Sequence, residues 1–408
     1  MRGVEGPLLL DCEDSAWFRD QPAAARGAAA ALGRRIGLGE HRTAQLVLAV
    51  AELATNVTKY SADGSMLLRV LRNEAVAGVE VVVVDGGPGM PDVAAALRDG
   101  VSTIGTLGIG LGAVQRLADR FDVQSVPGIG TVQLARFWPH PLHPSVTGEA
   151  VVGGITRPMG GEEVCGDAWA ARVDTGERAT DTRARDEGTG PSASGTPLDW
   201  SAMTAARRPV ERPYGTPHGS DRSPRPVAGG RSALVHGATA GPGRGVLVMS
   251  CDGLGHGPMA AIASQAAVQA FRSGTARTPE QVVEEVHRAL RGTRGAAVAV
   301  ARLEPDGRLL FCGIGNIGAA VVTADSRAGL LSHPGIVGNQ MRQLRTYEHH
   351  LPAHGALVMH SDGLTERWSP GDVAPLLHHP PALIATGLLR HAGTRRDDAS
   401  VVVAKGAW

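Results

Sequence analysis

The segment Val246-Leu-Val-Met-Ser-Cys-Asp-Gly-Leu-Gly-His-Gly257 brings an acidic side chain to a sharp, glycine-rich turn. An apolar run of β-forming residues precedes Asp252, and an alanine-rich, helix-prone segment begins at Met259. The glycines allow the backbone itself to approach an ion, and a carboxylate at a strand end is a suitable ligand for a hard cation. We therefore expect Asp252 to lie at the centre of a metal site.

The bulk composition excludes several classes of partner. The 408 residues carry 40 basic and 40 acidic side chains, so the formal net charge is zero. Because no polybasic run occurs, nucleic acid and anionic membranes are not expected partners. No apolar run is long enough to span a membrane, and the early acidic residues are unlike a secretory signal. The four cysteines form no Cys-x-x-Cys pair, so we expect a reducing, cytoplasmic location. The length of the chain predicts two or three domains.

A first polar motif lies on a predicted helix in the N-terminal third. Apolar residues recur there at three- and four-residue steps, namely Leu46, Val50, Leu53 and Val57. Glu52, Asn56 and Lys59 fall at helical spacing on the other side. Taken alone, this polar stripe is most simply a solvated helix face, and the segments that follow change that interpretation.

Two glycine-rich turns follow this helix. The strand predicted for residues 79–84 ends in Asp85-Gly-Gly-Pro-Gly89, an acid followed by a turn that glycine adopts most easily. A second glycine-rich loop, residues 102–112, leads directly into a helix predicted for residues 113–119. Exposed backbone N–H groups and a helix N-terminus form an anion site that suits phosphates. A predicted hairpin, residues 121–137, closes this domain.

Together these motifs resemble the N, G1 and G2 boxes of the GHKL (Bergerat) ATPase and kinase fold, an α/β sandwich, over residues 10–138. Within that fold, Thr55-Asn-x-x-Lys-Tyr60 and Asp99-Gly-x-Ser-Thr103 look like the small serine/threonine kinases of the RsbT and RsbW anti-sigma group, and RsbT more closely. The resemblance implies ATP with Mg²⁺ as the cofactor and a glycine-rich lid over the phosphates. It implies either that the domain is an active kinase or that it uses ATP chiefly to switch partners.

The same resemblance assigns roles to individual residues. It implies that Asn56 is a magnesium ligand and that Asp85 accepts a hydrogen bond from the adenine amino group. Glu52 is implied either as the base for a substrate hydroxyl or as a side chain that holds Asn56 or a water. The implied nucleotide-site residues are Asn56, Lys59, Asp85, Gly87, Gly89, Gly105, Gly108, Gly110, Gly112 and Thr131.

The middle of the chain predicts a domain boundary and an insertion. Pro139-His-Pro-Leu-His-Pro144 favours a stiff linker over residues 139–148, between an ATP-binding domain at 1–138 and a second domain at 149–408. Residues 174–231 are rich in Gly, Pro, Ser, Thr, Arg and Asp and have few aliphatic side chains. We expect this stretch to be a disordered insertion between two strands.

Four places in the second domain deliver carboxylates to predicted strand ends: Asp167, Asp252, Asp362 and the pair Asp397 and Asp398. Each alone fits an ordinary turn or cap. Together, with no matching Lys or Arg nearby, they favour an oxygen-ligand site for Mg²⁺ or Mn²⁺. Two such ions about 3.5–4 Å apart can activate a water for in-line attack on phosphorus.

The order of these motifs resembles the PPM metal-dependent protein phosphatases, and the SpoIIE/RsbX branch most closely. The motifs are Gly-Asp, Asp-Gly-Leu-Gly-His-Gly, Gly-x-Gly-Asn, Ser-Asp-Gly-Leu-Thr-Glu and Asp-Asp-x-Ser. The resemblance implies a PPM-type αββα sandwich with two Mn²⁺ or Mg²⁺ ions at one end of its sheets, so the whole chain is expected to be α+β. The implied metal ligands are Asp167, Asp252, the carbonyl of Gly253, Asp362, Asp397 and, with a less defined role, Asp398.

Two further residues of this domain keep alternatives open. His256 is implied either as the proton donor to the leaving serine oxygen or as a support of its turn. Asn316 is a candidate turn former between glycines.

The two resemblances imply a bifunctional regulator with a kinase domain and an opposing phosphatase domain. The implied substrate is a STAS-domain anti-sigma-antagonist-like protein in a partner-switching pathway, with a sigma factor or a second switch protein as the further partner. The alternative is a phosphatase whose N-terminal domain is a non-catalytic, ATP-dependent sensor or an anti-sigma-type binding module. A scaffold with two degraded sites is disfavoured because the acidic set is intact.

Overall fold

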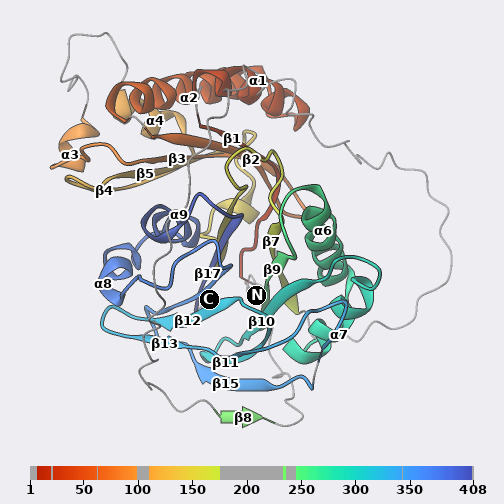
Figure 1. Cartoon of the computed structure of the whole chain (residues 1–408). Helices are drawn as coiled ribbons and strands as arrows, with labels where there is room; N and C mark the ends of the chain where they lie inside the picture. The colour runs from red at the N-terminus through yellow and green to blue at the C-terminus, as the bar shows by residue number, and fades with distance from the viewer. Residues whose placement is uncertain are drawn as a thin grey trace, which may run out of the picture.

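The computed structural model describes residues 7–19, 22–61, 63–98, 110–174, 233–235, 245–341 and 343–406. These residues form stacked layers of sheets and helices, with the N-terminal domain above the larger C-terminal domain in Figure 1. The predicted insertion, apart from Asp174, lies outside the described residues. Among the helices that are described, none combines the length and the hydropathy that crossing a membrane requires.

The N-terminal domain is built on a five-stranded antiparallel sheet in the order β1-β2-β3-β5-β4, counted over the described residues. Its strands are β1 (Asp11–Phe18), β2 (Ser65–Arg72), β3 (Ala77–Asp85), β4 (Arg120–Val126) and β5 (Gly130–Phe137). Successive side chains of a strand point to opposite faces. Val79, Val81 and Val83 therefore pack under the helices, whereas Val82 belongs to a different core on the opposite face.

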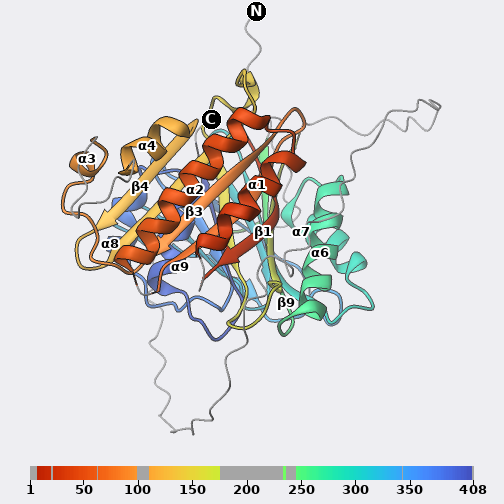
Figure 2. The same ribbon diagram turned by 90° about the horizontal axis from the view of Figure 1, so that it is seen from above.

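Helices cover the first of these faces, as Figure 2 shows from above. They are α1 (Ala25–Arg35), α2 (Glu40–Tyr60) and α4 (Gly110–Leu117), with the short η1 (Pro22–Ala24) and α3 (Val93–Ala96) beside them. The predicted amphipathic helix is confirmed as α2, because its apolar stripe is buried against the sheet: Leu46, Val50, Leu53 and Val57. The helix predicted for 113–119 is α4, which begins three residues earlier, at Gly110.

The C-terminal domain places two sheets face to face. The larger, with seven strands among the described residues, runs β7-β9-β10-β11-β15-β8, and β14 pairs with β11. The smaller runs β13-β12-β16-β17-β6. The strands are β6 (Val152–Arg157), β7 (Asp167–Asp174), β8 (Ala233–Val235), β9 (Gly245–Gly253), β10 (Ala296–Leu303), β11 (Arg308–Ile314), β12 (Gly318–Val322), β13 (Arg327–Gly329), β14 (Ser332–His333), β15 (Thr346–His350), β16 (Ala356–His360) and β17 (Ala399–Lys405).

Helices cover the outer faces of this pair of sheets, which gives the αββα arrangement. α6 (Pro258–Ser273) and α7 (Pro279–Ala289) pack on the larger sheet. α9 (Pro381–Ala392) packs on the smaller sheet, with α8 (Pro370–Val373) and η3 (Ala374–Leu376) beside it. The strand predicted for 162–173 begins only at Asp167, because residues before it form turns. The predicted linker contains a single 3-10 turn, η2 (Pro144–Val146).

The two domains share one hydrophobic core around α9. This core combines side chains of the smaller sheet and α9 with four from the lower face of the N-terminal sheet, namely Leu67, Val82, Val132 and Leu134. Polar contacts join the same layers: Trp17 Nε1 donates to Thr156 O at 2.8 Å, and Arg69 Nη1 donates to Gly154 O at 2.7 Å. α9 is therefore enclosed between two sheets that belong to different domains, as Figure 1 shows.

Candidate nucleotide and metal sites

The polar end of the N-terminal sheet is formed by Asp85 and the residues around it. Asp85 ends β3, and its Oδ1 accepts a hydrogen bond from the Gly87 amide at 2.9 Å. Thr131 lies opposite Asp85 on β5 and is buried, and its hydroxyl lies 2.9 Å from that of Ser125. Burial raises the pKa of Asp85, while the backbone amides of Gly87 and Thr131 and the charge of Arg390 act in the opposite direction.

Two glycines of this turn cannot carry a side chain. A Cβ on Gly87 would lie 2.6 Å from the carbonyl oxygen of Tyr60, the last residue of α2. Gly89 has a φ of +66°, and a Cβ there would lie 2.2 Å from the carbonyl oxygen of Val126. The Asp85–Gly89 turn is therefore pressed against the C-terminal end of α2 on one side and the β4–β5 hairpin on the other.

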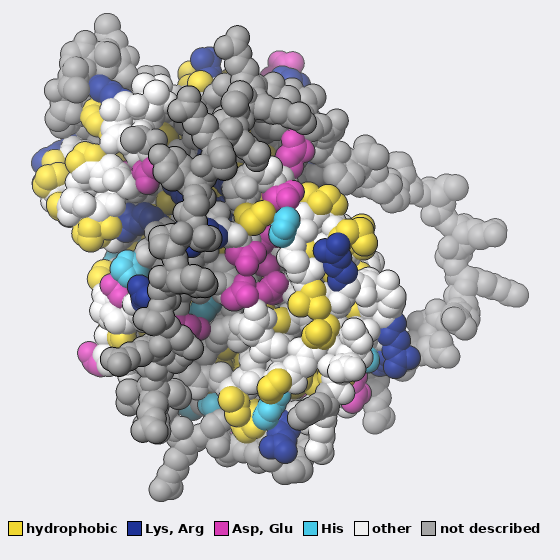
Figure 3. All heavy atoms as spheres, viewed as in Figure 1, with side chains coloured by type: hydrophobic (Ala, Val, Ile, Leu, Met, Phe, Trp, Pro, Cys, Tyr) yellow, Lys and Arg dark blue, Asp and Glu magenta, His cyan; other side chains and the backbone are white. Residues whose placement is uncertain are grey.

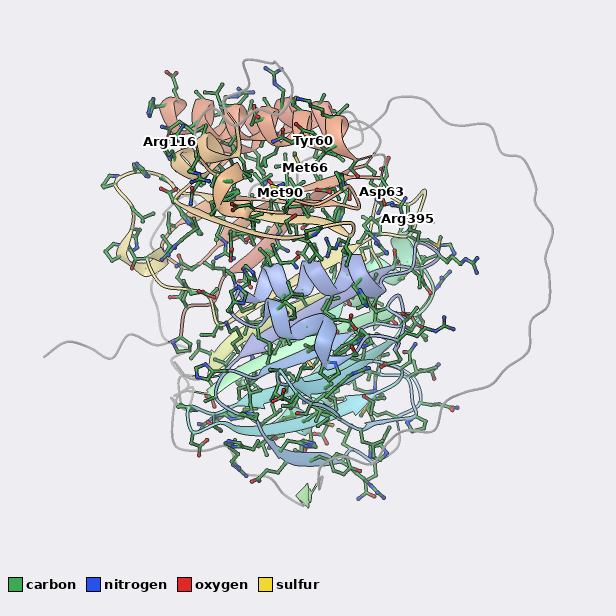
Figure 4. The ribbon with its side chains drawn as sticks, turned by 90° about the vertical axis from the view of Figure 1, so that its left-hand side faces the viewer. Tyr60, Asp63, Met66, Met90, Arg116 and Arg395 are labelled. Carbon is green, nitrogen blue, oxygen red and sulfur yellow. The ribbon has the colours of Figure 1, made fainter. Side chains whose placement is uncertain are left out.

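The predicted residues of α2 lie on the approach to this turn. Glu52 and Asn56 are half-buried and one helical turn apart, and Lys59 is exposed. Lys59 Nζ lies 5.2 Å from the centre of the Tyr60 ring. Tyr60 is exposed at the end of α2, and Met66 is buried on β2; both are labelled in Figure 4. Gly110 opens α4 with a φ of +75°, and Gly112 is buried within it, whereas Gly105 and Gly108 lie outside the described residues.

The second site draws carboxylates from both sheets of the C-terminal domain. Asp167 and Asp252 lie directly opposite each other on β7 and β9. Asp362 follows β16, and Asp397 and Asp398 directly precede β17. Acidic side chains gather near the middle of the face shown in Figure 3. Gly253 is buried next to Asp252, and its amide donates to Gly166 O at 3.1 Å.

Burial and, after it, mutual repulsion raise the pKa values of this group of carboxylates. Burial, followed by the charges of Asp362 and Asp397, raises the pKa of Asp252 to about 7. Burial and then Asp252 raise the pKa of Asp167 well above its ordinary value, although the Ser361 hydroxyl acts in the opposite direction. Burial, then Asp397, also raises the pKa of Asp362. Such a group needs protons or cations to be stable.

The donor set fits a hard divalent cation. Asp167 is 5% exposed, and its Oδ2 finds no hydrogen-bond partner among the described residues. Carboxylate oxygens in this state are ligands that Mg²⁺ and Mn²⁺ prefer. Within the described ranges, no three or more His, Cys, Asp or Glu side chains form a group that could hold an ion by themselves. Any ion here would therefore complete its coordination with water, as Mg²⁺ usually does.

Asp398 differs from the other carboxylates of the group. It is 2% exposed, its Oδ1 accepts from the Met159 amide, and its Oδ2 accepts from the Gly166 amide, both at 2.7 Å. These bonds fix the loop that leads into Asp167. They favour a positioning role for Asp398, and its role as a metal ligand stays a prediction.

Three residues near the site were not assigned to it from the sequence. Asn316 Nδ2 donates to Asp362 Oδ2 at 2.6 Å, so this residue does more than shape a turn. The Ser361 hydroxyl accepts from the Ser400 amide at 2.9 Å and supports Asp167. Glu162 Oε1 lies 3.1 Å from His256 Nδ1. Asn316 and Ser361 both stand within motifs quoted above, but Glu162 carries no signal in the sequence.

Comparison with known proteins identifies both domains. Residues 19–136 match the model of the histidine kinase-like ATPase domain, and residues 242–406 match that of stage II sporulation protein E (SpoIIE). The serine/threonine-protein kinase RsbT of Bacillus subtilis (strain 168) is 36% identical over 115 residues, which cover 28% of this chain and 86% of RsbT. The chain belongs to the RsbT-like kinase family. This RsbT-like domain is followed by a SpoIIE-type phosphatase domain of the metal-dependent PPM class, and the chain is an enzyme.

Comparison with solved structures finds proteins that are similar over part or most of the chain. One is described as the bacterial stressosome, a modular system that has been adapted to control secondary messenger signaling. It is 24% identical, with a TM-score of 0.42, and the match covers 62% of this chain and 98% of that protein chain. RsbX in complex with magnesium is 14% identical with a TM-score of 0.40, over 61% and 92%. The PP2C domain of SpoIIE from Bacillus subtilis, with a fragment of its regulatory domain, is 11% identical with a TM-score of 0.40, over 94% and 96%.

Proposed function

We propose that the chain is a bifunctional regulator of partner switching, which phosphorylates and dephosphorylates a serine or threonine of a STAS-domain regulatory protein. The RsbT-like domain uses ATP with Mg²⁺, and the SpoIIE-type domain hydrolyses the phosphoester with Mn²⁺ or Mg²⁺. The relationship to RsbT, a serine/threonine-protein kinase by name, supports the first activity. The match to SpoIIE supports the second. The STAS partner, and a sigma factor or second switch protein as its output, rest on the family resemblance.

The main structural support for the phosphatase activity is the group of buried, mutually repelling carboxylates, in which Asp167 Oδ2 has no hydrogen-bond partner among the described residues. Divalent ions held by Asp167, Asp252, the Gly253 carbonyl, Asp362 and Asp397 would supply positive charge for the phosphoryl oxygens and an activated water. Glu162 holds the Nδ1 side of His256. The other ring nitrogen, Nε2, is then oriented to deliver a proton to the leaving serine oxygen.

The kinase half rests on the polar end of the N-terminal sheet. Asp85, whose Oδ1 accepts from the Gly87 amide, accepts a hydrogen bond from the adenine amino group. Asn56 supplies an amide oxygen for the magnesium ion that accompanies ATP, and Lys59 offers a positive charge beside the phosphates. Glu52, one turn before Asn56, accepts the proton of the substrate hydroxyl.

A second candidate for the N-terminal domain is a nucleotide sensor that does not transfer phosphate. The packing of α9 against the N-terminal sheet favours this function, because an element of the phosphatase domain contacts the strands that carry Asp85 and Thr131. Both candidates require nucleotide binding, and only the first requires transfer to a protein.

Hydrolysis of p-nitrophenyl phosphate in the presence of Mn²⁺ tests the phosphatase half. We expect EDTA to abolish the activity and Asp362→Asn to lower kcat/KM by about a hundredfold or more, because charge stabilisation by metal ions contributes several kcal/mol. Asp325→Asn, an exposed carboxylate after β12, is the matched control and should leave the rate unchanged. Activity that persists in EDTA would refute the metal site.

A further inference from the structure

Large apolar side chains are exposed around the metal site of the SpoIIE-type domain. Nine such side chains are exposed among the described residues, and four of them stand within ten residues of Asp167 or Asp252 in the sequence. They are Val164, Leu254, Met259 and Ile262, which are 40%, 37%, 50% and 52% exposed. We call these four residues the apolar rim. Single exposed apolar residues are ordinary, whereas a group of them in one place marks a binding surface.

The loop before β7 packs against the first turn of α6. A Cβ on Gly166 would lie 2.7 Å from the Cβ of Ala260, so the two segments are in direct contact. Val164 precedes Gly166 by two residues, and Met259 directly precedes Ala260. The part of the apolar rim on the loop and the part on the helix therefore lie next to each other.

The turn after Asp252 joins the same surface. His256 of this turn has its Nδ1 3.1 Å from Glu162 Oε1, which belongs to the loop before β7. Leu254 is exposed in the turn, and its amide donates to Gly295 O at 3.1 Å. Figure 3 shows hydrophobic side chains beside the acidic group on this face of the molecule. The apolar rim thus borders the carboxylates of the metal site.

Helix geometry directs the α6 part of the rim toward the metal site. Met259 and Ile262 are three residues apart and share the exposed face of α6, whose opposite face is buried against the larger sheet. Side chains of a helix lean toward its N-terminus. Because α6 begins directly after the Asp252 turn, both side chains lean toward that turn.

An exposed arginine lies over the turn after Asp252. Arg294 Nη1 lies 3.0 Å from the position that a Cβ on Gly255 would take. The register of the sheet explains this contact, because Ala296 pairs with Gly253 and the two chains continue side by side beyond that pair. Guanidinium groups bind phosphate oxygens well. The surface therefore offers positive charge and apolar contact close to the carboxylates.

We propose that the apolar rim is the docking surface for the protein substrate of the phosphatase domain, and that this substrate presents a phosphoserine or phosphothreonine with aliphatic side chains beside it. The inference rests on the proposed function, which places the phosphoester at the metal site. A phosphorylated side chain of a folded protein reaches these carboxylates only when the surrounding surface of that protein covers the rim. Arg294 adds charge complementarity to the phosphate. The rim therefore selects phosphoproteins over small phosphoesters.

Hydrolysis of two substrates by the full-length chain tests the proposal. One is p-nitrophenyl phosphate, which is too small to cover the rim, and the other is a candidate STAS-domain protein that carries phosphoserine. No ATP is added, so the RsbT-like domain transfers no phosphate. The variant is Met259→Gln combined with Ile262→Gln, since glutamine is polar and favours helix. Leu48→Gln is the matched control, because Leu48 is 51% exposed on α2 of the other domain.

We expect the double variant to lower kcat/KM for the phosphoprotein by about tenfold or more, mainly through a higher KM, because a few apolar anchors carry most of the affinity of a protein interface. Its kcat/KM for p-nitrophenyl phosphate should stay within about twofold of wild type. That second result also shows that the variant is folded and holds its metal ions. Leu48→Gln should behave as wild type with both substrates.

Two results would overturn the proposal. Equal losses with both substrates would show that the substitutions act on the metal site. An unchanged rate with the phosphoprotein would show that the rim does not contact the substrate, and light scattering would then reveal whether it joins two copies of the chain, as a wild-type dimer that the double variant lacks. A wild-type chain that hydrolyses neither substrate, or only p-nitrophenyl phosphate, is a different result, because it counts against the proposed function itself.

Discussion

Asp252 illustrates how the metal site of the SpoIIE-type domain is held at the scale of single residues. Its carboxylate lies opposite Asp167, and burial, followed by the charges of Asp362, Asp397 and Asp398, raises its pKa to about 7. The ordinary value is 3.8, so in the metal-free state the folded protein binds a proton that the unfolded chain releases between these pH values. The stability of the metal-free protein therefore falls as the pH rises through this window.

Asp252→Asn removes that repulsion and should make the metal-free protein less sensitive to pH. In EDTA, we expect the wild-type free energy of unfolding to fall by a few kcal/mol between about pH 5 and pH 8, and that of Asp252→Asn to fall much less. Urea denaturation at both pH values measures this, with Asp325→Asn as the control. Equal losses in wild type and Asp252→Asn would show that the carboxylates do not repel one another as described.

Asn316 offers a second prediction at the scale of residues, because its amide donates to Asp362. Loss of a group that orients a metal ligand typically lowers the metal affinity by about 10- to 100-fold. We expect Asn316→Ala to raise the Mn²⁺ concentration for half-maximal phosphatase activity by about that factor. The maximal rate at saturating Mn²⁺ should change less. A shift in maximal rate with no change in the Mn²⁺ requirement would argue that Asn316 does not act through the metal site.

At the scale of secondary-structure elements, α9 and the segment after it connect the two sites. Thr394 N donates to Gly363 O at 2.7 Å, and Leu364 forms an isolated bridge with Gly393. The same segment continues through Arg395 to Asp397 and Asp398. A displacement at the end of α9 would therefore act on the loop of Asp362 and on Asp397 together.

We expect nucleotide binding to change the Mn²⁺ requirement of the phosphatase through this segment, by about fivefold or more if the coupling is of the usual size. Titrating Mn²⁺ against p-nitrophenyl phosphate hydrolysis, with and without a saturating non-hydrolysable ATP analogue, measures the effect. Arg395→Ala should reduce it, whereas Arg288→Ala should not. Superimposable Mn²⁺ curves with bound nucleotide would exclude coupling along this route.

The same element shows which features a sequence can and cannot predict. α2 was predictable because one face is apolar and the other polar. α9 was not predicted, because nearly all its side chains are buried between two sheets and it has little polar–apolar alternation. β1 and β2 also escaped prediction. Asp167, Asp252 and Asp362 were found because each stands beside a glycine, and Asp397 and Asp398 because they form an acidic pair before a strand. Glu162 stands in no such motif and reaches its site only through the tertiary packing.

At the scale of the whole molecule, a buried ion cluster lies beneath the interface between the domains. Glu80 is fully buried and accepts from Arg69 Nε at 2.8 Å and from Arg136 Nε at 2.7 Å. Arg69 also donates to Gly154 of the phosphatase domain. Burial alone would raise the pKa of Glu80, but the two arginines hold it below its ordinary value. The cluster therefore contributes stability above about pH 4.5, which is lost as the pH falls through the lowered pKa.

Glu80→Gln leaves two buried arginines without a counter-charge, and we expect it to lower the free energy of unfolding by about 3–5 kcal/mol. Because the cluster joins both domains, the variant should lower the melting temperature of the kinase-like and phosphatase domains together. Differential scanning calorimetry measures this, with the exposed Glu74→Gln as the control. Loss of stability in the N-terminal domain alone would show that the interface does not link the two domains energetically.

A phosphate-transfer assay tests whether one chain both adds a phosphate to a protein partner and removes it. The full-length Asp252→Asn variant is incubated with labelled ATP, Mg²⁺ and a candidate STAS-domain protein, beside wild type and an Asp252→Asn, Glu52→Gln double variant. We predict label on a serine or threonine of the partner with Asp252→Asn, little label with wild type because it is hydrolysed, and none with the double variant. Absence of transfer by an Asp252→Asn protein that still binds ATP would contradict the account and leave the N-terminal domain as a nucleotide sensor.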